Sequence, residues 1–162
     1  MRIHMGANYE GYELGRELED WVKSLGHEVA WHGADAYDFE DDYPLFAFRI
    51  GQAVIADEDA ALEVRGVLVG GVGGGETIAA NKVPGARAVF GHSVDFVTSS
   101  REHANASILV IGALNTKLED AKAMINAIID AKFTNVLDDA RRIVNTNEYE
   151  ASKTIEGWTI TG

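Results

Sequence analysis

Short apolar runs alternate with amphipathic segments along the whole chain. Several of the runs are almost continuously apolar, which is typical of strands that are covered on both faces of a sheet. The predicted strands are residues 2–7, 27–33, 65–71, 86–91 and 107–113. Helical patterns lie between and after them, at residues 11–25, 44–56, 76–82, 93–104, 117–131 and 136–150. Gly26 is placed to end the first helix, and Ser93 and Asp95 are placed to cap and charge the start of the fourth.

This alternation of strands and helices predicts parallel strands joined by right-handed crossovers, and hence a doubly wound α/β fold. A chain of 162 residues suits one domain with a sizeable core. We expect that domain to span residues 1–150 and a C-terminal tail to follow at 151–162. The tail carries Trp158 and Ile160 on a polar segment, which favours docking onto the body or a partner subunit over a frayed end.

Composition and charge exclude several classes of partner. The formal net charge of −12 argues against binding to nucleic acid or to anionic membrane surfaces. No apolar run is long enough to span a membrane, and the N-terminus lacks the pattern of a secretory signal, so we expect a cytoplasmic protein. The chain has no cysteine, which removes disulfides, thiolate nucleophiles and cysteine metal sites.

The stretch GGVGGGETIAANKVPG at residues 70–85 holds six glycines and one acid, Glu76. Its first part, residues 70–76 (the glycine loop), follows a predicted strand and opens a helix, at the edge of the sheet where ligands bind in such folds. Glycines let the backbone approach a ligand and turn successive N–H groups into one concavity, and a helix start adds partial positive charge. The glycine loop therefore predicts a site for an oxyanion.

Three kinds of functional site compete for this loop. A nucleotide P-loop needs Gly-Lys-Ser/Thr, which is absent. In a dinucleotide site, the Glu76 carboxylate would repel the pyrophosphate of the ligand. Such a site also normally occupies the first strand–helix turn, here GANYEG. The third is an oxyanion cradle with a general base, since proton abstraction beside a carbonyl needs a base for the C–H proton and donors for the enediolate. A purely structural Glu76 that favours the helix dipole stays open, although the glycines beside it favour function.

At this loop the sequence resembles the family of type B ribose-5-phosphate isomerases and galactose-6-phosphate isomerases. The resemblance is carried by GETIAANKVPGARA (75–88), REHANAS (101–107), DYP (42–44) and the opening MGANYEGYEL, in order over roughly residues 1–150. It implies a homodimer of five-stranded Rossmann-like subunits with active sites built from both chains, and it leaves open whether dimers pair into tetramers. It also implies aldose–ketose isomerisation of a sugar through a cis-enediolate, with no metal and no other cofactor.

The resemblance implies roles for individual residues. One branch of the family has a cysteine base at the position of Gly70, and another uses a glutamate at the position of Glu76; this chain is similar to the second. His103 matches the histidine that opens the sugar ring, and Tyr43 matches a tyrosine that lines the pocket. The enediolate would be held by the backbone N–H groups of Gly71, Val72, Gly73, Gly74 and Gly75.

The opening motif departs from the family pattern. Gly-x-Asp-His-x-Gly reads GANYEG here, so Asn8 and Tyr9 replace an aspartate that handles the ring oxygen and a histidine that faces the phosphate. In the glycine loop, Val72 and Gly74 replace polar residues. We expect Asn8 and Tyr9 to shape the far end of the pocket in place of the phosphate contacts.

The phosphate-binding positions of the family change most. Leu114 replaces an arginine after the fifth strand, and on the last helix Arg-His-x-x-Arg reads DDARR, ending at Arg142. Arg142 keeps its place, but Asp138 lies four residues before it and can pair with it instead of a phosphate. Losing two charge-assisted hydrogen bonds to phosphate costs about 3–6 kcal/mol, or roughly two to four decades of affinity.

These changes predict an aldose–ketose isomerase acting on a small sugar or sugar derivative without a phosphate. Glu76 would move the proton between neighbouring carbons, and His103 of the partner chain would exchange protons with the sugar oxygens. Two alternatives stay open. One is a ribose-5-phosphate isomerase with an altered phosphate site, and the other is a family member that has lost catalysis and serves as a subunit or sugar-binding module. The presence of both Glu76 and His103 argues against the second alternative.

Overall fold

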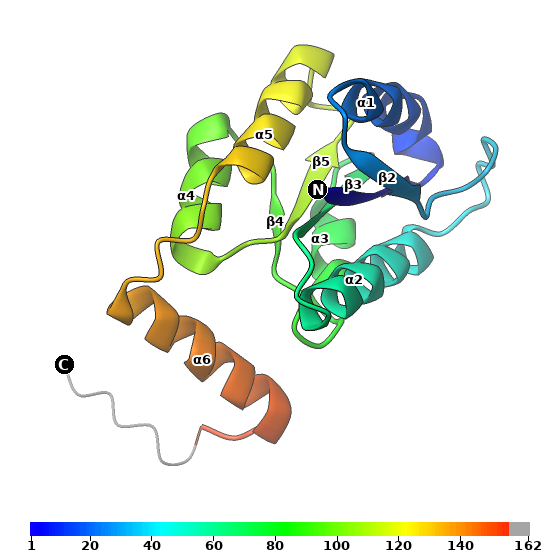
Figure 1. The fold of residues 1–162 in the computed structure, drawn as a ribbon. Coiled ribbons are helices and arrows are strands. Elements are labelled where there is room, and N and C mark those ends of the chain that lie inside the picture. The colour runs from blue at the N-terminus through cyan, green and yellow to red at the C-terminus, as the bar shows by residue number, and fades with distance from the viewer. Residues whose placement is uncertain (156–162) are drawn as a thin grey trace.

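Five parallel strands form the centre of the protein (Figure 1). The computed structural model describes residues 1–155. The strands are β1 (Arg2–Ala7), β2 (Glu28–Trp31), β3 (Val64–Gly70), β4 (Ala88–Phe90) and β5 (Ile108–Gly112). They form one sheet in the order β2-β1-β3-β5-β4, and every neighbouring pair is parallel. The expected doubly wound five-stranded fold is confirmed, and each strand lies within three residues of its predicted ends.

Six α-helices and one short 3₁₀ turn connect or follow these strands in the described part of the chain. They are η1 (Tyr9–Gly11), α1 (Tyr12–Ser24), α2 (Tyr43–Asp59), α3 (Gly74–Ala80), α4 (Val94–Ala104), α5 (Leu118–Asp130) and α6 (Leu137–Ser152). Gly26 ends the first helical segment with a φ of 87°, and the Ser93 side chain caps α4 by accepting from the Phe96 N–H. α2 and α6 run two or three residues further than predicted, because no glycine or proline stops them.

The sheet separates two hydrophobic cores. Successive side chains of β3 point to opposite faces, so Val67 and Val69 join one core and Leu68 joins the other. α1, α4 and α5 cover the first face, and α2 and α3 cover the second (Figure 1). This two-sided burial explains why the strands are apolar at nearly every position.

Helix α6 extends along the outside of the body next to α4 (Figure 1). Near its end, Oε2 of Glu150 accepts a hydrogen bond of 2.7 Å from the N–H of Gly85. Several large apolar side chains of this segment stay exposed, Leu137 at 82% and Val144 at 52% among them. The expected docking of Trp158 and Ile160 lies outside the described residues.

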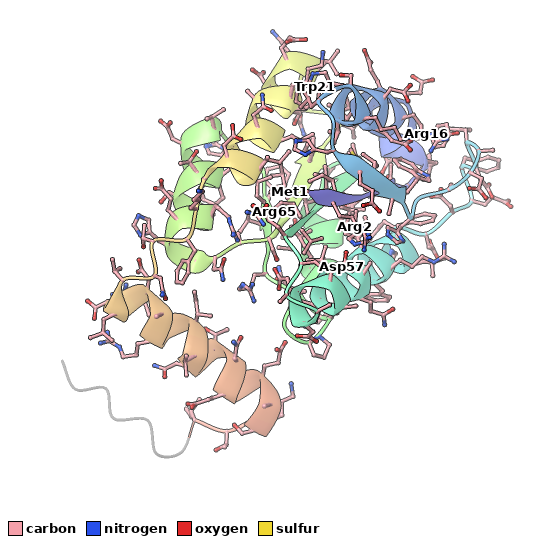
Figure 2. The ribbon with its side chains drawn as sticks, in the orientation of Figure 1. Met1, Arg2, Arg16, Trp21, Asp57 and Arg65 are labelled. Carbon is pink, nitrogen blue, oxygen red and sulfur yellow. The ribbon has the colours of Figure 1, made fainter. Side chains whose placement is uncertain are left out.

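A network of polar side chains joins the start of β1 to α2. Arg2 and Asp57 lie side by side (Figure 2), with Nη1 of Arg2 3.0 Å from Oδ2 of Asp57. His4 joins them, its Nε2 lying 3.0 Å from the same oxygen and its Nδ1 lying 2.7 Å from Nε2 of His32. Burial lowers the pKa of His32, and the nearby His4 and Arg49 lower it further. These histidines have a structural explanation.

Candidate functional site

The carboxyl ends of β1 and β3 lie next to each other in the middle of the sheet, because Ala7 pairs with Val69. The strand order reverses here, since β2 lies beyond β1 on one side and β5 and β4 lie beyond β3 on the other. Ligands of open α/β sheets bind at such a reversal. The fold therefore brings Asn8, which follows β1, beside the glycine loop, which follows β3.

The glycine loop is held by its carbonyl groups. Those of Gly70 and Gly71 accept hydrogen bonds of 2.8 and 3.0 Å from the N–H groups of residues 113 and 114 after β5. Gly73 has a φ of 92°, which glycine adopts at little cost, and its carbonyl accepts from the N–H and hydroxyl of Thr77. The N–H groups of residues 71–73 donate to no acceptor between residues 1 and 155. They are free to bind an oxyanion.

Glu76 lies in the first turn of α3 and is 4% exposed. Its carboxylate packs directly on Gly70, where a Cβ atom would overlap Oε1 and Cδ of Glu76. This carboxylate has no hydrogen-bond or ion-pair partner in the described part of the chain. It therefore fills the space above position 70, where the resemblance implies a cysteine base in one branch of the family. Its oxygens are not bound to another protein group.

Two further side chains touch the glycine loop. A Cβ atom on Gly75 would overlap the hydroxyl of Tyr43, so the tyrosine expected to line the pocket does lie against the loop. A Cβ atom on Gly71 would overlap the carboxylate of Glu10. Sequence reasoning missed Glu10, because it stands at the unspecified position of the opening motif. The loop thus has a second carboxylate near it besides Glu76.

The residues expected at the far end of the pocket, Asn8 and Tyr9, are used partly in holding the backbone. Oδ1 of Asn8 accepts from the Gly11 N–H at 3.2 Å, which caps η1, and the Asn8 side chain is buried. The N–H of Tyr9 donates to Oδ1 of Asp41 at 3.0 Å, and its ring meets the edge of Tyr37. The amide nitrogen of Asn8 and the hydroxyl of Tyr9 are the groups left for a substrate.

Asp41 adds a negative group beside Tyr9 that the sequence did not point to. Its second oxygen, Oδ2, is buried and has no hydrogen-bond partner among residues 1–155. Burial raises the pKa of Asp41, the hydrogen bond from the Tyr9 N–H opposes this rise, and two neighbouring aspartates add to it. This side of the site is therefore acidic where the family pattern has a histidine.

Val72 and Leu114 form an apolar rim beside the cradle. Both side chains are 63% exposed, and the Leu114 N–H donates to the carbonyl of Gly71. An arginine at position 114 would reach the same rim, and the replacement of a phosphate contact by Leu114 stays a prediction. The rim offers no charge to an anion.

His103 and Arg142 lie near the amino-terminal ends of the strands, opposite the end that carries the glycine loop. His103 is in the last turn of α4, which runs back from the carboxyl end of β4 toward the start of β5. Both side chains line a hollow of about 350 Å³ between α6 and the body. A single chain therefore brings the two together, but does not bring either of them to Glu76.

The expected pairing of Asp138 with Arg142 is wrong. Nη1 of Arg142 donates to Oδ1 of Asp139 at 2.9 Å, and Asp138 instead pairs with Arg141, also at 2.9 Å. Both pairs use a spacing of three residues on α6, which a helix allows as readily as four. Asp139 also contacts His103, so the carboxylate at this position is shared between Arg142 and His103.

The described residues contain no group of three or more histidines and acids that could hold a metal ion. None of the helices within residues 1–155 is both long and apolar enough to cross a membrane.

A comparison with protein-family models matches residues 3–146 to the model described as Ribose/Galactose Isomerase. The chain belongs to the ribose/galactose isomerase family. The family expected from the sequence is thereby confirmed, and so is the expectation of an isomerase. The match covers all strands except the first residue of β1, includes most of α6, and contains both Glu76 and His103.

Individual members of the ribose/galactose isomerase family are similar over nearly the whole chain. Ribose-5-phosphate isomerase B of Mycobacterium tuberculosis is 38% identical over 150 residues, which are 93% of this chain and 90% of that protein. The solved structure of ribose-5-phosphate isomerase B from Clostridium thermocellum has a TM-score of 0.87 and 34% identity, and covers 95% of this chain and 100% of its own. That of the Mycoplasma genitalium enzyme with bound ribulose-5-phosphate has a TM-score of 0.87 and 27% identity, with coverages of 93% and 97%.

Proposed function

We propose that this protein interconverts the aldose and ketose forms of a small sugar phosphate, with ribose 5-phosphate and ribulose 5-phosphate as the first pair to test. The observation that carries the proposal is the position of Glu76. Its buried carboxylate lies on Gly70 and beside backbone N–H groups that no described residue uses. The relatives are isomerases of ribose 5-phosphate, which supports a phosphorylated substrate, and nothing in the comparisons supports the unphosphorylated sugar expected from the sequence.

Glu76 acts as the base of the isomerisation. It takes the proton from the carbon that carries the hydroxyl group next to the carbonyl and returns it to the neighbouring carbon. In between, negative charge develops on an enediolate oxygen, and the N–H groups of residues 71–75 lie where they can stabilise it. A base and an oxyanion cradle in one loop are what this proton transfer requires.

His103 serves the sugar oxygens, and it comes from a second copy of the chain. The strand β3 between the two sheet edges has 7 residues, which corresponds to about 20 Å of extended backbone. A proton transfer needs heavy atoms about 3 Å apart, so His103 cannot reach the oxygens of a small sugar that is bound at Glu76 of its own chain. A homodimer in which α4 and α6 of one chain complete the site of the other satisfies both positions. The exposed apolar side chains of α6 favour such a contact.

The phosphate end of this site has few cations of its own. Leu114 brings none, Tyr9 brings a hydroxyl, and Arg142 is already paired with Asp139. Glu10 and Asp41 add negative charge nearby. We therefore expect a sugar phosphate to bind weakly, with a high KM. We expect its phosphate group to contact backbone N–H groups and the exposed side of the partner's α6.

The test follows deuterium uptake by proton NMR. The purified protein is incubated in heavy water with matched sugar phosphates and free sugars. Isomerisation of ribose 5-phosphate with deuterium entering beside the carbonyl supports the proposal, and Glu76→Gln should lower that rate by roughly 10²–10⁴-fold. Glu13→Gln, an exposed acid in the first turn of α1, is the matched control. Turnover of free sugars alone would contradict the phosphorylated substrate, and full activity of Glu76→Gln would contradict the base.

A further inference from the structure

His103 contacts a carboxylate that lies 36 positions later in the chain. Its Nδ1 is 2.8 Å from Oδ2 of Asp139. The side chain of Asp139 is 9% exposed, whereas that of His103 is 55% exposed. One nitrogen of the imidazole ring is therefore fixed on a nearly buried group, while the rest of the ring is open to an incoming molecule.

The Asp139 carboxylate is itself held in place from two further directions. Arg142 donates from Nη1 to Oδ1 at 2.9 Å, on the side away from His103. Asp139 also lies in the first turn of α6, where the helix dipole favours a negative charge. The hydrogen bond with His103 lowers the pKa of Asp139 most, and Arg142 adds to this effect while burial opposes it. The carboxylate is thus ionised at neutral pH and its orientation is set.

An ionised carboxylate accepts hydrogen bonds and cannot donate them. In the neutral imidazole of His103, Nδ1 must therefore carry the proton, and Nε2 must carry the free lone pair. Nε2 has no hydrogen-bond partner in residues 1–155. The ring is thereby prepared to accept a proton at Nε2, and the same carboxylate stabilises the imidazolium that results.

We infer that Asp139 is the positioning residue of His103, fixing the orientation of its ring and its Nδ1–H tautomer. The inference rests on the proposed role of His103 in opening the sugar ring. In that step the proton of the anomeric hydroxyl moves to Nε2, its electron pair forms the carbonyl, and the ring C–O bond breaks. The ring oxygen then takes up the proton from Nε2, so His103 returns to its starting state.

This assignment also gives Arg142 a different task from the one expected from the sequence. Its guanidinium binds the carboxylate that orients His103, and that carboxylate neutralises it. The resemblance implied a histidine at the position of Asp139, so it did not point to this pairing.

Asp139→Asn is the decisive variant. Arg142 only donates, so it holds the amide oxygen on its own side and turns the amide NH₂ toward His103. Nδ1 must then accept a hydrogen bond, and the proton of the neutral ring moves to Nε2. Replacing the carboxylate behind a catalytic histidine by an amide is known to lower turnover through the wrong tautomer while leaving the geometry intact.

Asp138→Asn is the matched control. Asp138 is the preceding residue on the same helix, and it pairs with Arg141 at a position where its side chain is 63% exposed. Asp138→Asn changes the net charge and the first turn of α6 in the same way as Asp139→Asn. It does not touch His103.

Two readouts are measured on the full chain at neutral pH. The first is the ¹⁵N NMR spectrum of the imidazole rings, with the His103 signals assigned by their loss in His103→Gln. The second is the steady-state isomerisation of ribose 5-phosphate, or of whichever sugar in the deuterium experiment reacts. We expect Asp139→Asn to lose the Nδ1–H tautomer and to lower kcat about 10²-fold, with KM changed less than about threefold. Asp138→Asn should leave the Nδ1–H tautomer and kcat unchanged.

The failure of this inference differs from the failure of the proposed function. If Asp139→Asn keeps the Nδ1–H tautomer and a kcat within about twofold, while His103→Gln is inactive, Asp139 is not a positioning residue. If His103→Gln is itself fully active, the proposed role of His103 is wrong. Should Asp139→Asn not fold, Asp139→Ala removes the acceptor altogether and is expected to lose the Nδ1–H tautomer as well; keeping it would overturn the inference.

Discussion

Two inactive variants of this protein should restore each other's activity when they share a dimer. Glu76→Gln removes the base at one edge of the sheet, and His103→Ala removes the imidazole at the other. In a mixed dimer, one site receives both substitutions, and the other receives an intact Glu76 from one chain and an intact His103 from its partner. Random pairing makes about half of the dimers mixed, and each has one working site in two, so co-expression should recover about a quarter of the wild-type rate.

The assay uses the two variants with different affinity tags, so that mixed dimers can be isolated and their isomerisation rate compared with each parent. Glu76→Gln paired with Gly70→Ala is the control, because both changes damage the same half of the site and no fully intact site can form. Mixed dimers of Glu76→Gln and His103→Ala that are no more active than the parents would refute the shared site. Activity would then require both residues from one chain, against the separation of the two sheet edges.

Three more predictions concern single residues. Gly70→Ala should displace only the flexible end of Glu76, so kcat should fall at least roughly tenfold while the unfolding midpoint changes by only a few degrees; an unchanged kcat would contradict the packing of the carboxylate on this glycine. Glu10→Gln should lower KM for ribose 5-phosphate about fivefold, because roughly 1 kcal/mol of repulsion is removed, whereas Glu13→Gln should leave KM unchanged. The low pKa of His32 means that the unfolded chain takes up a proton that the folded chain refuses, so stability should be lost as pH falls from about 7 toward 5. Denaturant titrations of His32→Gln should show a smaller loss over this range, and an equal loss would assign the effect to other groups.

The sheet and the glycine loop could be predicted because their signals are local. Strands buried on both faces are apolar at nearly every position, and the glycines at 70–75 indicate an unusual backbone conformation directly after one of them. The proximity of Asn8 to this loop also follows from the order of parallel strands. These features depend on neighbours in sequence and on general rules of topology.

The side-chain pairings could not be predicted in the same way. The helix spacing allowed Arg142 to reach either Asp138 or Asp139, and only the contact of His103 with Asp139, from a different helix, decides between them. Glu10 gave no signal, because a single acid between a strand and a helix is common on any surface. Such pairings depend on how separate elements pack, which no local pattern contains.

The contact between Gly70 and Glu76 has a consequence for the history of the family. A cysteine at position 70 and a carboxylate from position 76 would require the same space, so a descendant of this chain could not add the thiol first and give up the acid later without moving the acid aside. A lineage that exchanges one base for the other must therefore displace the carboxylate when it gains the thiol, or change both codons together. The cysteine branch and the glutamate branch that the resemblance implies would then differ in which of two groups occupies this one space.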